Sequence, residues 1–143
     1  MDRFETFTVL ISKISRNIRK LKSQEMAKYN LKTPHVSCLY YLYKNGNLTA
    51  KNLCDICDED KASISRSIDF LEKNGLLSYE QQEEKKYKSY LYLTEKGKDV
   101  AKDLVEKIDS ILMVSSNGVD ENEREVFYRS LVKICKNLEK LSK

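Results

Sequence analysis

The amino-acid sequence predicts a mainly α-helical fold with a small β-wing. Only four glycines and one proline occur among the 143 residues, and 34% of the residues are charged. Such a low content of turn-forming residues favours long helices over a many-stranded sandwich. Apolar residues recur every three or four positions in most segments, whereas residues 76–93 have aromatic and aliphatic ends around a charged middle. We therefore expect one unit over residues 1–143, built from helices and a single hairpin.

The first predicted helix lies within residues 1–32 and is amphipathic. Its apolar side chains recur at three- and four-residue steps, which places them on one stripe. They are Phe7, Leu10, Ile11, Ile14, Ile18 and Leu21. The same segment holds eight Lys or Arg residues against three acids, so its solvated face is expected to be basic.

A second helix is predicted from Thr33 to the residue before Gly46. Thr33 is the expected N-cap, and Pro34 suits the first helical position, where a missing N–H group matters little. Gly46 suits the position after the last turn, because glycine readily adopts the left-handed conformation common there.

Two short helices are predicted next. The segment LTAKNLCDICD indicates a third helix that is capped by Thr49 and has Leu53, Ile56 and Cys57 on one face. The segment DEDKASISRSIDFLEKNG indicates a fourth helix with an apolar stripe of Ile64, Ile68 and Leu71. Its expected cap is Asp58 or Asp60, and its expected end is Asn74-Gly75. Two short helices joined by a tight turn predict a helix-turn-helix.

A hairpin and two further helices complete the predicted order. The segment LLSYEQQEEKKYKSYLYL is typical of two strands and an exposed loop, with Leu91 and Leu93 facing inward and Tyr90 and Tyr92 facing outward. Thr94 can cap a helix whose stripe is Val100, Leu104, Ile108 and Ile111. SSNGVDENE then breaks the chain before a last helix marked by Val126, Leu131, Ile134, Leu138 and Leu141. This order predicts a winged helix-turn-helix over residues 33–97.

The run LTAKNLCDICDEDKASISRSIDFLEKNGLLSY, followed by YLYLTEKGKDV, resembles the MarR family of bacterial transcriptional regulators. In that family the helix-turn-helix ends in a pattern that matches Arg66, Asp69, Leu71, Glu72, Gly75 and Leu76 here. The wing then closes with a pattern that matches Leu93, Thr94 and Gly97. The resemblance implies that residues 1–32 and 98–143 are dimerisation helices, which accounts for their apolar stripes outside the winged part.

The wing departs from the family pattern at one place. Family members usually carry an Asp-x-Arg pair there, and the corresponding positions in this sequence are Lys85 and Tyr87. An arginine inserted into a minor groove is therefore not expected from this position. Lys86 and Lys88 are expected to contact phosphate instead.

The fourth helix is the predicted recognition helix for double-stranded DNA. With its apolar stripe turned to the core, helical geometry directs Ala62 and Arg66 outward and leaves Ser63 and Ser65 on the flanks. Arginine can read guanine through two hydrogen bonds, and serine can pair with several bases. Phosphate contacts, which position a protein without reading sequence, are expected from Lys51, Lys61, Lys86 and Lys88. For any one of these lysines alone, a plain solvated side chain is the simpler interpretation.

The four cysteines do not indicate a metal site. Cys54 and Cys57 form one Cys-x-x-Cys pair, whereas a structural zinc site needs four ligands, and the sequence has only one histidine. Because unpaired cysteines are commonly buried, we expect these two in the core, with redox sensing as the alternative interpretation. No cofactor is expected.

The family resemblance also implies a small-molecule effector. Many members bind an aromatic or phenolic ligand between the dimer helices and the winged part, and the residues placed near that region by resemblance are Tyr29, His35, Cys38 and Tyr40. The simpler interpretation of such residues is a half-buried side chain with a satisfied polar tip.

Several function classes are disfavoured by the sequence. An enzyme is not expected, because there is no glycine-rich phosphate loop and no acid and base pair at a suggestive spacing. No apolar run reaches the roughly 20 residues of a membrane span, so we expect a cytoplasmic protein without membrane contact. The leading hypothesis is a homodimeric DNA-binding repressor on a pseudo-palindromic operator, relieved by a ligand or another signal. A winged helix used for protein contacts is the alternative, because residues 44–98 carry ten basic and ten acidic side chains.

Overall fold

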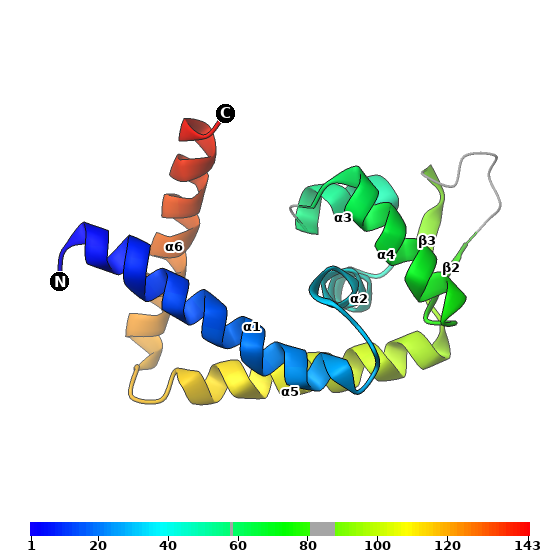
Figure 1. The fold of residues 1–143 in the computed structure, drawn as a ribbon, viewed down its shortest axis with the longest axis horizontal. Helices are drawn as coiled ribbons and strands as arrows, with labels where there is room; N and C mark the ends of the chain where they lie inside the picture. Colours follow the sequence, from blue (N-terminus) through cyan, green and yellow to red (C-terminus); the bar gives the residue numbers. More distant parts are fainter. Residues whose placement is uncertain (58, 81–87) are drawn as a thin grey trace. The chain divides into compact units, whose positions relative to one another are not determined.

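The computed structural model describes residues 1–57, 59–80 and 88–143 (Figure 1). Contacts divide the chain into two units, Met1–Asp109 and Ser110–Lys143. The first unit contains the predicted winged helix-turn-helix and the N-terminal helices. The second contains the end of α5 (Glu95–Ser115) and all of α6 (Glu121–Leu141).

The first unit begins with a long helical segment. A π-helical stretch, η1 (Glu5–Leu10), runs into α1 (Ile11–Ala27), and only Met26 of these two elements is buried. The predicted apolar stripe is largely open to solvent within the chain: 40% of Phe7 and 44% of Ile14 are exposed. The helix predicted for residues 1–32 is thus confirmed, and its apolar side chains are left uncovered by the rest of this unit.

Helix α2 (Thr33–Asn45) forms the centre of the winged part. The expected N-cap was wrong by one residue: Lys32 is the capping residue, and Thr33 begins the helix with Pro34 in its first turn. His35 completes this end, since its Nδ1 accepts a hydrogen bond of 3.0 Å from the Lys32 backbone N–H. Gly46 ends the helix as predicted, with a φ of 79° in the left-handed region.

The helix-turn-helix consists of α3 (Ala50–Cys57) and α4 (Lys61–Lys73). Thr49 caps α3 as predicted, because its hydroxyl accepts from the Asn52 N–H at 3.1 Å and its own N–H donates to the Asn52 side chain at 3.0 Å. Of the apolar face predicted for α3, Leu53 is fully buried, but Ile56 is 38% exposed. That helix therefore buries a narrower face than its sequence suggested.

The wing belongs to a three-stranded sheet, one strand more than the sequence predicted. Strands β2 (Leu77–Tyr79) and β3 (Tyr90–Leu93) form the expected antiparallel pair, and β1 (Leu48–Thr49) adds to the other edge of β3. Leu48 lies opposite Leu91 in β3, as does Tyr79 from β2. The predicted alternation in β3 is confirmed, with Leu91 and Leu93 buried and Tyr90 and Tyr92 exposed. A strand of two residues has too little alternation to be recognised in a sequence.

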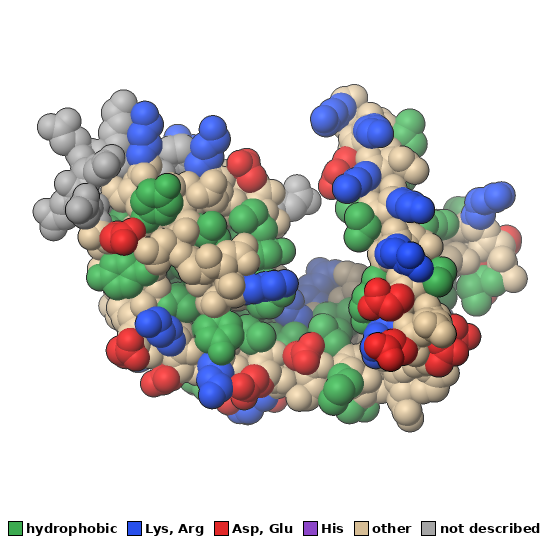
Figure 2. Space-filling model, turned by 180° about the vertical axis from the view of Figure 1, so that it is seen from behind, with side chains coloured by type: hydrophobic (Ala, Val, Ile, Leu, Met, Phe, Trp, Pro, Cys, Tyr) green, Lys and Arg blue, Asp and Glu red, His purple; other side chains and the backbone are tan. Residues whose placement is uncertain are grey.

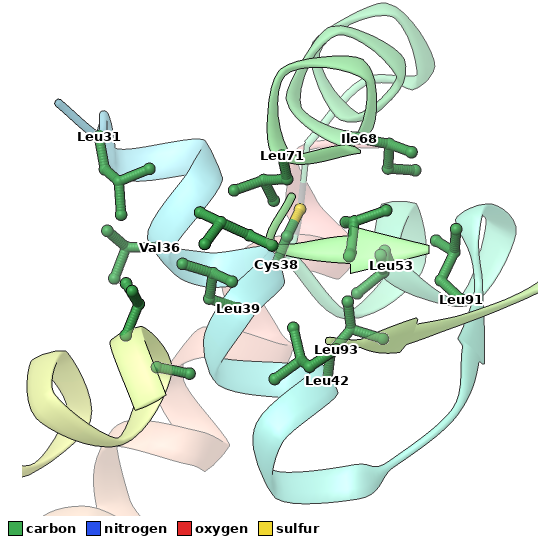
Figure 3. Packing of buried hydrophobic residues seen from close by; sticks show 14 of the residues in the cluster. Leu31, Val36, Cys38, Leu39, Leu42, Leu53, Ile68, Leu71, Leu91 and Leu93 are labelled. Atoms are coloured by element: carbon green, nitrogen blue, oxygen red, sulfur yellow. The ribbon is translucent and has the colours of Figure 1, made fainter. Parts of the chain in front are cut away.

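The core of the first unit lies between α2, α4, the sheet and the start of α5 (Figure 3). The predicted stripes of α4 and α5 supply much of it, and Cys38 of α2 is fully buried among leucines in the same cluster. The buried members of the two stripes are Ile64, Ile68, Leu71, Val100 and Leu104. This packing fixes which side of α4 faces solvent.

The second unit is dominated by α6. Asp120 caps the helix, accepting from the Glu123 N–H at 2.9 Å, and the Glu123 carboxylate accepts from the Asp120 N–H at 3.1 Å. Half or more of several large apolar side chains is exposed in the chain, among them Val126, Phe127, Val132, Leu138 and Leu141. Lysine and arginine side chains stand along the same helix in Figure 2.

Candidate nucleic-acid interface

The first turns of α4 present the predicted recognition surface. Asp60 is the N-cap, with its carboxylate accepting a hydrogen bond of 2.6 Å from the Ser63 N–H. The alternative cap, Asp58, lies outside the described residues. Burial of Ile64, Ile68 and Leu71 holds the opposite side of the helix against the core, as the sequence predicted.

The structure brings most of the predicted DNA-contacting residues of α4 onto one exposed surface. Lys61, Ala62, Ser65 and Arg66 are exposed, and Ser63 is half-buried beside them. Among the described residues, no carboxylate forms an ion pair with Arg66. Small side chains around one long arginine allow a helix to approach base edges closely.

Two of the lysines predicted to contact phosphate lie outside α4 and are also exposed. Lys51 lies in the first turn of α3, and Lys88 lies just before β3. Lys86, together with the departure from the family pattern at Lys85 and Tyr87, lies outside the described residues. The phosphate contacts assigned to Lys51, Lys61, Lys86 and Lys88 remain predictions.

The end of α4 is joined to the end of the wing by a set of hydrogen bonds. The Thr94 hydroxyl donates to the Gly75 carbonyl at 2.6 Å, and the Thr94 N–H donates to the Leu76 carbonyl at 3.1 Å. The Lys96 ammonium adds a bond of 3.1 Å to the Asn74 carbonyl. These bonds hold the end of α4, the base of the wing and the start of α5 together.

Gly97 allows this close approach. A Cβ atom at residue 97 would lie 1.8 Å from the Leu76 carbonyl oxygen, far inside any contact distance. The Gly97 N–H meanwhile donates to the Thr94 hydroxyl at 3.0 Å, so Thr94 also caps α5, as predicted. The Leu-Thr-x-x-Gly pattern therefore has a physical reason: threonine supplies the bonds, and glycine supplies the space.

The residues predicted for an effector make contacts of their own. The Tyr29 hydroxyl donates to the Asp103 carboxylate on α5, and this bond is the main reason that the pKa of Tyr29 lies above its usual value. The His35 ring stacks on Phe70 of α4, with centroids 4.2 Å apart, and partial burial lowers the pKa of His35. Cys38 is fully buried, and Tyr40 packs edge to face on Tyr41. Binding of an effector by these four residues remains a prediction.

The contact between His35 and Phe70 was not predicted from the sequence. It joins the first turn of α2 to the last turns of α4, across 35 residues of chain. Periodicity within each helix shows only which side of that helix is apolar, so such a long-range pairing carries no local signal.

The cysteines differ in their burial from what the sequence suggested. Cys54 and Cys57 are half-buried, so the expectation that both lie in the core was wrong, and the fully buried thiol is Cys38. The three nevertheless pack in or against one cluster. A hydrogen bond to Cys57 and burial raise the pKa of Cys38, the same bond lowers the pKa of Cys57, and burial raises that of Cys54. None of the four cysteines forms a disulfide.

The described part of the chain contains neither a metal-binding cluster nor a membrane-spanning helix. No group of three or more His, Cys, Asp or Glu side chains there is placed to hold a metal ion. No helix in that part is long and apolar enough to cross a membrane.

Comparison with known proteins gives consistent results. The MarR family model matches residues 29–86, which cover α2, the helix-turn-helix and the first part of the wing. The chain is 25% identical over 130 residues to the HTH-type transcriptional regulator YybA of Bacillus subtilis (strain 168), covering 91% of this chain and 87% of that protein. It is 24% identical over 131 residues to the HTH-type transcriptional regulator BilQ of Clostridioides difficile (strain CD3), covering 92% and 86%.

Solved structures share the fold over most of the chain. A putative MarR family transcriptional regulator from Listeria monocytogenes, complexed with 26mer DNA, is 27% identical with a TM-score of 0.80 and covers 90% of this chain and 85% of its own. Staphylococcus aureus MarR in complex with salicylate and kanamycin is 19% identical with a TM-score of 0.81, covering 96% and 90%, and shows the fold alone. The family model over residues 29–86, the relatives and the winged helix-turn-helix agree, and they show that this chain is similar to transcriptional regulators of the MarR family.

Proposed function

We propose that the protein is a cytoplasmic homodimer that binds double-stranded DNA at a pseudo-palindromic operator and represses transcription until a small ligand or another signal releases it. The observation that carries this proposal is the exposed start of α4, where Arg66 projects from among small side chains with no carboxylate paired to it in the described residues. The Listeria monocytogenes relative that is complexed with 26mer DNA supports the choice of partner.

The uncovered apolar side chains of the terminal helices support the dimer. Within the first unit, η1 and α1 expose an apolar stripe, and within the second unit α6 exposes another. Large apolar surfaces left open in one chain are typical of protein interfaces. A two-fold dimer would present two copies of α4 about one turn of DNA apart.

The DNA assignment can be tested by replacing Arg66. Operator fragments are first selected from genomic DNA with the purified protein, and affinities are then measured by fluorescence anisotropy at fixed salt. Loss of a bidentate contact to guanine is worth roughly 1–3 kcal/mol, so we expect Arg66→Ala to weaken specific binding about tenfold or more. The preference for operator over unrelated DNA should fall by the same factor.

The matched control is Lys102→Ala, which removes one exposed positive charge from α5, outside the recognition surface. It should bind the operator nearly as well as the unchanged protein. Sedimentation should give the same dimer for all three proteins. Specific binding that survives Arg66→Ala would show that α4 does not read the operator through this residue.

Repression itself is tested by placing the selected operator before a reporter gene. Expression that rises when the regulator is deleted supports repression, and expression that falls shows an activator. A protein-interaction role, the alternative raised by the balanced charge of residues 44–98, would instead be supported by failure to select any DNA fragment.

A further inference from the structure

A second surface of the winged part has the form of a ligand site. It is an open cavity of about 610 Å³ over the junction of α2, the sheet and α5, within the first unit. Cavities of roughly 300–1,000 Å³ are usual for small-molecule sites. Among the described residues, the lining contains none of those predicted to contact DNA and none of the four predicted to bind an effector.

The cavity combines an apolar base with exposed aromatic rings. Leu42 and Leu93 are almost fully buried, with 3% and 6% of their surface exposed. Tyr43 of α2 is 41% exposed, and Tyr92, on the outward side of β3, is 37% exposed. Figure 2 shows hydrophobic side chains of this kind exposed between charged ones on the winged part. Half-exposed tyrosine rings can stack on a planar ligand or attract a cation.

The charged groups that the described residues contribute to the lining are Glu80 and Lys98. The Glu80 carboxylate accepts a hydrogen bond of 3.1 Å from the Asn47 side-chain amide, which holds it at the cavity. In the described part of the chain Glu80 has no ion-pair partner. The Lys98 ammonium lies 3.3 Å from the Glu95 carboxylate, so its charge is already partly balanced.

We infer that this cavity binds a planar aromatic molecule carrying a protonated amine. The aromatic part lies against Tyr43, Tyr92 and the leucines, and the ammonium group donates to the Glu80 carboxylate, which has no ion-pair partner in the described part of the chain. An ammonium group adds the attraction between opposite charges to its hydrogen bond with the carboxylate, whereas a neutral hydroxyl donates the bond alone, so the carboxylate selects the cation over a neutral analogue. The tyrosine rings add to this preference, because the face of an aromatic ring attracts positive charge.

The backbone at the mouth of the cavity leaves room for such a ligand. Gly46, which has no side chain and nothing within 4 Å of the position of a Cβ atom, lines one edge. Asn47 follows it and is already bonded to Glu80. The amide NMR signals of Gly46 and Asn47 should therefore shift when a ligand binds in the cavity. The inference concerns binding alone, so it does not depend on the proposed repressor function.

The inference is tested with three indole derivatives of nearly equal shape. Tryptamine carries an ammonium group, tryptophol carries a neutral hydroxyl in its place, and indole-3-propionate carries a carboxylate. Each is titrated into the ¹⁵N-labelled protein at pH 7, and the amide signals are followed by NMR. We expect tryptamine to shift the signals of Gly46 and Asn47 and to bind about tenfold more tightly than tryptophol. Indole-3-propionate should bind more weakly than either.

Variants then test each part of the site. Glu80→Gln should remove the preference for tryptamine over tryptophol, and Tyr43→Ala should weaken both ligands by about fivefold. Lys98→Ala should leave tryptamine binding unchanged or tighter. Asp99→Asn, which neutralises an exposed carboxylate outside the lining, is the matched control for Glu80 and should change nothing.

The NMR spectrum of each variant shows directly whether it is folded. Equal affinities for tryptamine and tryptophol in the unchanged protein would overturn the inference. Shifts confined to other residues, absence of binding at millimolar ligand, or weaker tryptamine binding in Lys98→Ala would do so as well.

Discussion

Replacing Gly97 by alanine should destabilise the protein, although glycine to alanine in a helix normally stabilises it. The added Cβ would start 1.8 Å from the Leu76 oxygen, and such contacts essentially never fall below 3.0 Å, so the backbone must move by at least 3.0 − 1.8 = 1.2 Å. A movement of this size breaks the 3.1 Å bond from the Thr94 N–H to the same oxygen. The strand entering the wing would then separate from the start of α5.

The expected change in the free energy of unfolding is the sum of two losses and one gain. Overpacking costs about 1–3 kcal/mol, and the lost hydrogen bond costs about 1 kcal/mol. The better helix propensity of alanine returns about 1 kcal/mol. The net loss in the free energy of unfolding is then roughly 2 kcal/mol, which lowers Tm by about 8 °C for a chain of this size.

The assay is thermal unfolding followed by circular dichroism at a fixed protein concentration, since dimerisation would make Tm depend on concentration. Gly46→Ala is the matched control. Its φ of 79° is strained for alanine, but nothing lies within 4 Å of the new Cβ, so about 1 kcal/mol should be lost through strain alone. A Tm for Gly97→Ala equal to or above that of the unchanged protein would refute the close-approach argument.

Three further predictions concern pH, thiol reactivity and salt. Only a neutral His35 ring can accept the bond from the Lys32 N–H, and burial lowers the pKa of His35 below 6.5. The free energy of unfolding should therefore be constant above about pH 6.5 and fall as the pH drops through the lowered pKa. His35→Gln should remove this pH dependence. In native protein, Ellman's reagent should modify the exposed Cys135 first and the fully buried Cys38 last, and rapid modification of Cys38 would contradict its burial. Lys88→Ala should weaken operator and unrelated DNA equally and reduce the slope of log K against log salt by about 0.9, whereas a sequence-selective loss would exclude a phosphate-only role.

Most of the helical framework could be predicted from the sequence because its signals are local. The stripe of Ile64, Ile68 and Leu71 and the caps at Thr49 and Thr94 each depend on residues within a few positions of one another, and the structure confirms them. The same locality explains the success with Leu91 and Leu93, whose alternation with tyrosines is visible in four residues.

Apart from the N-cap of α2, which was wrong by one residue, the errors arise where distant segments meet. Strand β1 forms because Leu48 and Thr49 pair with the edge of β3, some forty residues away in the sequence. Two residues are too few to show a strand pattern by themselves. The exposure of Ile56 and the burial of Cys38 depend on how helices cross, which periodicity does not determine. The cavity beside Tyr43 is likewise lined by residues from four separate segments, and no spacing in the sequence predicts it.

Asn74, Gly75 and Leu76 are joined by hydrogen bonds to Thr94 and Lys96. These bonds also determine where in the wing a substitution should affect stability. They close the wing at its base, and none of them involves residues 81–87. We therefore expect the tip of the wing to tolerate substitution with little loss of stability, while the base does not. Tyr87, at the position where the family pattern has arginine, lies outside these bonds and outside the described residues. The bonds at the base of the wing therefore set no requirement on the side chain at this position.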